Sequence, residues 1–492
     1  MKKIKSVIAL TLAALTCGTF AFAAGCNSNP HSNETTGELQ FDEQGKVVFE
    51  DVNIKLATVV AGTDSAVFKQ LVDRFNSAYE GKIYIESDST AQGVYETQIA
   101  NRISNNANAP DLLMSHGKYH KNFADKRLIR PFNNVMELSG IEINFSDYSE
   151  GLMQYRNLGA TDGSVYSIAA DAQSTIVVYN KQQMAEIGYT KAPSNRAELL
   201  DACAKYKAKY DKTPIAWADA DNSTGNFQEY TLGTAILQNG GSIANAEGRC
   251  DWHENETNRA AVQNAIKAYR ELYDNGYAVR NYAKNKCIED FVNGNSLFYF
   301  LAPWELSGLV SNYASEYNKN HLNPEDHITE QQVIDEYVGG ASLSGWFAMG
   351  DNANKAYANY IYGDSHCFAM SRTVKDITKQ AAILEFINWF TTSGSVAAKW
   401  AEAGHISSCK SAVASSEYKS NAYAKNYFAN FYPDINNFQN MPVVKNANTF
   451  VSNLTTLFVS TVAVSSGYDT ASDNSAIETR QDDINNALDY IT

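Results

Sequence analysis

Side chains suited to ligand chemistry are concentrated in residues 217–225, which have the sequence WADADNSTG. Trp217 stands beside the carboxylates of Asp219 and Asp221 and the amide of Asn222. An indole ring next to acids and an amide is the mixture of apolar and polar groups that lines small-molecule sites, including sites for sugars. We expect this segment to contact a ligand, with an ordinary surface loop as the alternative.

The same acids could begin a calcium-binding loop, because Asp219 and Asp221 have the spacing of its first ligands. The match fails further along. Thr224 stands where such loops need glycine for a sharp turn, and Tyr230 stands where they need a bidentate glutamate. Another pair, His116 and His120, has a spacing suited to zinc on one helical face, but no third ligand is nearby. We therefore expect neither a metal nor a cofactor.

Motifs of known catalytic sites are missing or misplaced. The sequence contains no HExxH, GxSxG or P-loop motif. Gly363-Asp364-Ser365-His366 resembles the nucleophile block of GDS-type hydrolases, but it stands late in the chain and no Asp-x-x-His follows it. We interpret it as the start of a strand. Paired carboxylates for glycoside cleavage leave no local signature, so a glycoside hydrolase stays open as an alternative.

Trp304 follows a strand expected at 296–301. Its indole ring could stack on the apolar face of a pyranose, while polar groups meet the hydroxyls at the ring edge. The alternative is a tryptophan of the core or rim, on the helix that begins there. Trp346 is a further candidate for ligand contact, as are Tyr95 and His405.

The spacing of apolar residues predicts alternating strands and helices from residue 53 onward. Strands are expected first at 53–60, 82–86 and 112–114, with helices between them. This order predicts an α/β fold with a parallel sheet covered on both faces. Later strands are expected at 174–179, 213–217 and 296–301, and long surface loops in the polar, Asn-rich segments 313–340 and 407–445.

Parallel sheets of this kind bind ligands outside the carboxyl ends of their strands. Asp111, Ser115 and His116 lie around the end of the third expected strand, and Thr63 and Asp64 follow the first. We expect these side chains near the site. Ordinary capping between strand and helix is the alternative.

The first residues have the features of an export signal. A cationic start, MKKIK, precedes an uncharged apolar stretch from Ser6 to Phe22, and Ala23-Ala24-Gly25-Cys26 follows. The last four residues resemble a bacterial lipobox, which implies that Cys26 is acylated and becomes the first mature residue. We therefore expect a signal peptide at 1–25 and, because residues 26–48 are polar, a flexible tether behind the anchor.

Charge and cysteine usage narrow the class of protein. The chain has a net charge of −15, and removal of residues 1–25, which hold three lysines and no acid, lowers it to near −18. An acidic surface disfavours nucleic acid as a partner. Five cysteines remain after Cys17 and Cys26 are set aside, and no CxxC pair is present. One disulfide such as Cys250–Cys287 is conceivable; otherwise these are small core residues.

Four segments resemble motifs of one known family in the same order and at similar spacing. They are 109–113 (APDLL), 163–181 (GSVYSI and later VYNK), 291–304 (FVNG and later APW) and 380–404. Together they resemble the family 1 extracellular solute-binding proteins, the maltose-binding-like receptors of ATP-driven sugar importers. The resemblance covers about residues 50–492.

The resemblance implies a two-lobed fold of the periplasmic-binding-protein type, with discontinuous lobes and a ligand cleft between them. When the family's lobe boundaries are transferred to this sequence, lobe one comprises 49–168 and 345–396, and lobe two comprises 172–343 and 397–492. The lobes would close on the ligand by hinge motion.

The resemblance also bears on individual residues. It places Trp304 where an aromatic residue often meets sugar, and Asp171 where a carboxylate can bind ligand. A carboxylate can accept two sugar hydroxyls through charge-assisted hydrogen bonds. A hinge cap or a salt bridge is the alternative for Asp171.

Residues and resemblance together predict the extracytoplasmic receptor of an ABC importer, held at the cell membrane by lipid. We expect a monomer that binds a carbohydrate, an oligosaccharide above all, and passes it unaltered to the permease subunits. A receptor for a different solute, such as a peptide, a polyamine or an anion, is one alternative. A surface-anchored glycoside hydrolase is the other.

Overall fold

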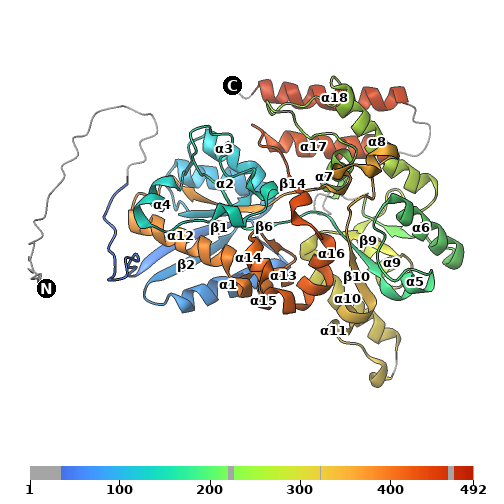
Figure 1. Cartoon of the computed structure of the whole chain (residues 1–492), viewed down its shortest axis with the longest axis horizontal. Helices are drawn as coiled ribbons and strands as arrows, with labels where there is room; N and C mark the ends of the chain where they lie inside the picture. Colours follow the sequence, from blue (N-terminus) through green and yellow to red (C-terminus); the bar gives the residue numbers. More distant parts are fainter. Residues whose placement is uncertain (1–34, 220–226, 322, 464–469, 491–492) are drawn as a thin grey trace, which may run out of the picture. The chain divides into compact units, whose positions relative to one another are not determined.

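The computed structural model describes residues 35–219, 227–321, 323–463 and 470–490. A six-stranded sheet, a four-stranded sheet and the helices packed on them account for most of this part of the chain (Figure 1). The predicted signal peptide at 1–25 and the predicted acylation site, Cys26, lie outside the described residues.

The first sheet is built around three parallel strands that follow one another in the sequence. Val52–Thr58 (β1) pairs with Ile83–Ser89 (β2) on one side and with Leu112–His116 (β3) on the other. His366–Ser371 (β12) adds antiparallel to β3, so the sheet is mixed and not wholly parallel. Two short strands complete it against β12, Ile129–Arg130 (β4) and Ile168–Ala169 (β5).

Helices cover the first sheet because their apolar faces match its buried side chains. All five residues of β3 are buried, as expected for a strand covered on both faces. The rings of Phe75 and Phe386 meet edge to face at 4.9 Å between the covering helices. Those helices are Thr63–Ala78 (α1), which packs on β2, Ile377–Thr392 (α12), which packs on β1 (Figure 1), and Gln92–Ser104 (α2).

The second sheet has four strands. Ile176–Asn180 (β7) lies between Val338–Ala341 (β10) and Phe298–Leu301 (β9) and is antiparallel to both. Ile215–Ala216 (β8) pairs in parallel with β9. Its surrounding helices are Lys181–Glu186 (α5), Arg196–Tyr210 (α6), Phe227–Gln238 (α7), Glu256–Asp274 (α8), Lys284–Val292 (α9), Leu306–Asn320 (α10), Ala447–Leu457 (α17) and Thr470–Asp489 (α18).

Short strands mark where the chain passes between the two sheets. Asp171–Ala172 (β6) pairs antiparallel with Ile406–Ser407 (β13). Gln173 and Asp364 form a further antiparallel bridge, with reciprocal N–H···O bonds of 2.9 Å. Ile361–Gly363 (β11) pairs with Phe438–Asn440 (β14) and packs on α7. The chain thus joins the first sheet at His366, directly after this bridge.

The prediction of long surface loops at 313–340 and 407–445 is wrong. The first segment contains the end of α10, a helical turn Glu330–Gln332 (α11) and β10. The second segment contains Lys410–Ala414 (α14), Ser416–Ser420 (α15), Ala429–Phe431 (α16) and β14. Both segments fold because aromatic residues spaced within their polar stretches are buried, among them Tyr313, Tyr427 and Phe431.

Five cysteines are free and buried in the described part of the chain, so the conceivable Cys250–Cys287 disulfide is not formed. Burial raises the pKa of the Cys287 thiol to about 12, which keeps it unreactive. Among the described helices, none combines the length and the apolar character needed to cross a bilayer.

Candidate functional site

A buried ion-pair cluster joins the first sheet to the helices of the second. Lys118 lies in the turn after β3, and its Nζ is 2.9 Å and 3.2 Å from the two carboxylate oxygens of Glu229 on α7. The same Nζ is 3.4 Å from Oδ2 of Asp364, which lies between β11 and β12. The three side chains are at most 1% exposed. We call these three residues, with His116, the Lys118 cluster.

The charges of the Lys118 cluster support one another. Burial would lower the pKa of Lys118, but the Glu229 carboxylate, with smaller contributions from its other neighbours, raises it well above the ordinary value. Burial would likewise raise the pKa of Asp364, but Lys118 and His116 hold it below the ordinary value. Burial raises the pKa of Glu229, the second acid that shares this ammonium. Lys118 therefore stays charged in the protein interior.

His116 ends β3 and extends the Lys118 cluster toward the sheet-to-sheet crossings. Its Nδ1 lies 2.9 Å from Oδ2 of Asp364 and 3.1 Å from Nε2 of Gln173. Burial lowers the pKa of His116. Ser115, the neighbouring candidate, is also buried and lies 2.9 Å from Nε2 of His120.

A second cluster surrounds Asp171 and lies next to the first. Oδ1 of Asp171 accepts the backbone N–H of His366 at 2.9 Å, and Oδ2 accepts Nε1–H of Trp400 at 2.9 Å. Oδ2 also lies 3.0 Å from Nδ1 of His366 and 3.7 Å from Nδ1 of His405. Burial opposes ionisation, but His366 and His405 lower the pKa of Asp171 to about 2. Asp64, from α1, lies 3.3 Å from Nε2 of His405.

Trp304 lies in a different environment, at the wall of a cavity. It belongs to the short 3-10 turn Pro303–Glu305, directly after β9, and is half-buried. The cavity measures about 240 Å³ and is lined by apolar side chains from β9, α9 and α10 together with Lys284, Glu305 and Asn312. A mixed apolar and polar cavity beside an indole ring is what a sugar ring requires.

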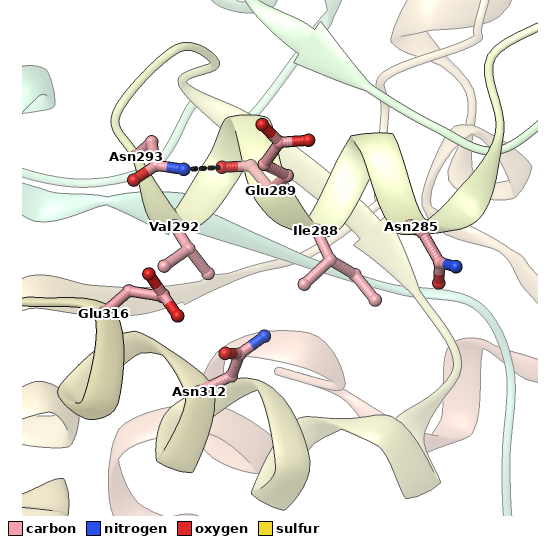
Figure 2. A pocket seen from close by; sticks show the side chains of 7 residues that line it. All are labelled: Asn285, Ile288, Glu289, Val292, Asn293, Asn312 and Glu316. Atoms are coloured by element: carbon pink, nitrogen blue, oxygen red, sulfur yellow. Dashed lines mark hydrogen bonds between the residues drawn. The ribbon is translucent and has the colours of Figure 1, made fainter.

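A second cavity continues the first between α9 and α10. It measures about 440 Å³ and shares Ile288 and Asn312 with the cavity at Trp304. Figure 2 shows Ile288 and Val292 of α9 facing Asn312 and Glu316 of α10. Apolar side chains and amide and carboxylate groups together line the two adjoining cavities.

Several predicted site residues have partners within the fold. Trp217 is fully buried, and its Nε1–H donates to the hydroxyl of Tyr273 at 2.7 Å. Asp219 accepts from the same hydroxyl at 2.8 Å. Trp346 is also fully buried, and its Nε1–H donates to the carbonyl of Pro193 at 2.9 Å.

Other predicted residues lie apart from the two clusters or outside what is described. Asp111 lies at the amino end of β3, where it accepts the backbone N–H of Lys55 at 2.9 Å, so β3 separates it from His116. Thr63 begins α1, and only its backbone is described. Asp221 and Asn222 lie outside the described residues.

The structure also brings in residues that the sequence did not indicate. Lys118 lies two residues beyond His116, so the rule for strand ends could have found it. Glu229 gave no signal, because it reaches Lys118 from a helix of the other sheet. Asp364 and His366 belong to the GDSH segment, whose interpretation as the start of a strand is confirmed by β12.

Comparison with known proteins decides the family. A profile of bacterial extracellular solute-binding proteins matches residues 70–426. The chain belongs to this family. Its members are binding proteins that work outside the cytoplasm, and the recognised resemblance is therefore confirmed. No curated protein matches the chain by sequence.

Solved structures confirm the predicted two-lobed fold. The sugar-binding protein MalE from Xanthomonas citri superposes with a TM-score of 0.68 at 16% identity, over 89% of this chain and 98% of that one. The maltotriose-bound MalE domain from Bdellovibrio bacteriovorus gives 0.60 at 14% identity, over 89% and 100%. UgpB from Mycobacterium tuberculosis, in complex with glycerophosphocholine, gives 0.63 at 16% identity, over 88% and 98%.

Proposed function

We propose that this solute-binding protein is the carbohydrate receptor of an ABC importer. The observation that carries the proposal is the shared fold of this chain and receptors solved with acarbose, maltotriose or cycloalternan. The cavity at Trp304 supports it, because a half-buried indole ring beside apolar and amide groups suits the two faces of a sugar.

In this proposal Trp304 stacks on a sugar ring, and polar groups at the ends of the strands bind its hydroxyls. His116 is the candidate for a hydroxyl contact, since it ends β3 beside the crossings and is 8% exposed. Gln173 and Lys118 are buried and already paired, so they hold His116 and Asp364 in place. Asp171 acts mainly in support, because both of its oxygens already accept hydrogen bonds from His366 and Trp400.

Closure of the two lobes is the expected motion. The crossings at β6, β13 and the Gln173–Asp364 bridge are short paired segments that could act as the hinge. Lys118 and Glu229 come from the two sides of these crossings, so their ion pair links the two halves beside the proposed hinge. A sugar that adds contacts to the closed form shifts the population toward it.

The location and partners follow from the same proposal. Acylation of Cys26 would hold a monomer at the outer face of the cell membrane, close to the permease subunits that receive the sugar. Mass spectrometry of the chain expressed in a bacterial host tests the anchor. We expect an acylated N-terminal cysteine and release from membranes in a Cys26→Ser variant; an unmodified, soluble wild-type chain would contradict the anchor alone.

A thermal-shift screen across mono- and oligosaccharides tests the ligand class. Stabilisation by an oligosaccharide that is recovered intact supports a receptor, whereas shortened products indicate a glycoside hydrolase. Glycerophosphocholine belongs in the same screen, because the neighbour UgpB binds it and a receptor for a different solute is the second candidate. A response to that solute and to none of the sugars would contradict the carbohydrate assignment.

A further inference from the structure

We infer that Asp171, His366 and His405 form a binding site for a divalent metal ion of the zinc class. One ligand-type atom from each residue lies within 4.8 Å of the other two. The three residues are 0%, 4% and 0% exposed. They meet where the chain crosses between the sheets, since Asp171 begins β6, His366 begins β12 and His405 directly precedes β13.

The distances fit ligands that share one tetrahedral ion. Zinc binds imidazole nitrogen and carboxylate oxygen at about 2.0–2.1 Å, which places two ligand atoms about 3.4 Å apart. Oδ2 of Asp171 lies 3.0 Å from Nδ1 of His366 and 3.7 Å from Nδ1 of His405. These two separations bracket the required value. The third, between nitrogens of His366 and His405, is within 4.8 Å, so the two rings would move together when an ion binds.

An unpartnered ring nitrogen of His405 gives the independent argument for a cation. Nε2 of His405 lies 3.3 Å from Oδ2 of Asp64, and Nδ1 is the nitrogen on the side of Asp171. This Nδ1 is shielded from water and has no hydrogen-bond partner in the part of the chain that the structure describes.

Nδ1 of His405 faces a carboxylate oxygen of Asp171 at 3.7 Å. A charge-assisted hydrogen bond between the two atoms would be about 2.7–2.9 Å long. The longer separation suits a shared metal ion better than a shared proton.

Surrounding groups hold these ligands in place. The carboxylate of Asp64 orients His405 as carboxylates orient metal-bound histidines. The Trp400 ring stacks on the His405 ring at 4.4 Å with a 16° interplanar angle, and its Nε1–H holds Asp171. The carboxylates of Asp64 and Asp171 place two acids around the His405 ring, and a divalent cation would balance their charge. The ion would tie β6, β12 and β13 together and stiffen the crossings without touching solute.

Metal uptake by chelator-treated protein tests the inference. The full chain without a histidine tag is treated with EDTA, dialysed, and titrated with Zn²⁺ or Co²⁺. We expect about one bound ion per chain by mass spectrometry of metals, visible Co²⁺ absorption of tetrahedral intensity, and a higher melting temperature. His405→Gln should abolish all three. His327→Gln, a change of an exposed histidine, should leave them intact.

A milder variant guards against misfolding of His405→Gln. Asp64→Asn keeps the shape of the side chain and should weaken metal affinity 10- to 100-fold, with an unchanged circular dichroism spectrum. Failure of the native chain to bind one ion would overturn the inference, as would binding that survives His405→Gln. Thermal shifts with sugar, measured in parallel, report on the proposed receptor function separately.

Discussion

Nζ of Lys118 lies 2.9 Å from Oε1 of Glu229, and the two side chains are 1% and 0% exposed. They are 111 residues apart in the sequence and come from elements on different sheets. The fold therefore joins its two halves through a charged pair in its interior. Such pairs contribute little net stability, but removing one partner leaves a buried charge without compensation.

Replacement of Lys118 by methionine should therefore destabilise the protein strongly. We expect a loss of about 3–5 kcal/mol in the free energy of unfolding, measured with denaturant. Lys69→Met is the matched control, because Lys69 pairs with Asp73 on the surface, with side chains 71% and 59% exposed. That change should cost at most about 1 kcal/mol.

The double variant Lys118→Met with Glu229→Gln sharpens the test. It removes both charges and should recover a large part of the loss, because no unpaired ion remains. Equal, small losses in Lys118→Met and Lys69→Met would show that the Lys118 pair is open to water.

Trp304→Ala should abolish the thermal response to sugar. Removing an indole ring that stacks on the ligand should weaken binding at least about tenfold, or ~1.4 kcal/mol. Trp389→Ala is the control, since Trp389 is also half-buried but packs on Phe75 beside the first sheet. It should lower the melting temperature and keep the response. A full response in Trp304→Ala would place the sugar elsewhere.

Gly404 should be intolerant of a side chain. Its φ is +94°, and a Cβ there would lie 2.2 Å from the carbonyl oxygen of Pro303, next to Trp304. Gly404→Ala should displace this turn, lower the melting temperature and weaken sugar binding. Gly45→Ala is the matched control: its φ is +75°, but nothing lies within 4 Å of the added Cβ.

The comparison of the two glycine variants separates backbone strain from the clash. Gly45→Ala should cost only about 1–2 kcal/mol of left-handed strain, whereas Gly404→Ala adds about 1–3 kcal/mol for overpacking. Equal losses of stability, with sugar binding unchanged, would mean that the turn at Trp304 moves freely.

His120 should make the protein less stable in acid. Burial lowers the pKa of His120 to about 3, and its two ring nitrogens lie 2.9 Å and 2.8 Å from the hydroxyls of Ser115 and Ser167. The unfolded chain has the ordinary value of about 6.5, so below that pH it binds the proton that the folded chain excludes. This contribution is complete above about pH 6.5 and declines by ~1.4 kcal/mol per pH unit below it.

Unfolding measured at pH 7 and at pH 5 tests the role of His120. His120→Gln should remove about 2 kcal/mol of the decline between these values, and His327→Gln, on the surface, should remove none. An identical decline in all three proteins would exclude His120 as its source.

The periodicity of the sequence was sufficient to predict the first strands and their order. The alternation of apolar residues from residue 53 predicted β1, β2 and β3, and their parallel pairing is present. It failed for residues 313–340 and 407–445, because there buried aromatic residues alternate with asparagine and serine and give no clean period.

The sequence by itself determined the family, the α/β class and the order of the first strands, because these depend on neighbouring residues. The partners of the charged groups were decided only by the tertiary structure. Asp171 meets His366 from 195 residues away and Trp400 from 229 residues away. Periodicity fixes which face of an element is buried, but not which distant element covers it. The chemistry of a buried acid depends on which distant element covers it, because that element supplies its hydrogen-bond partners.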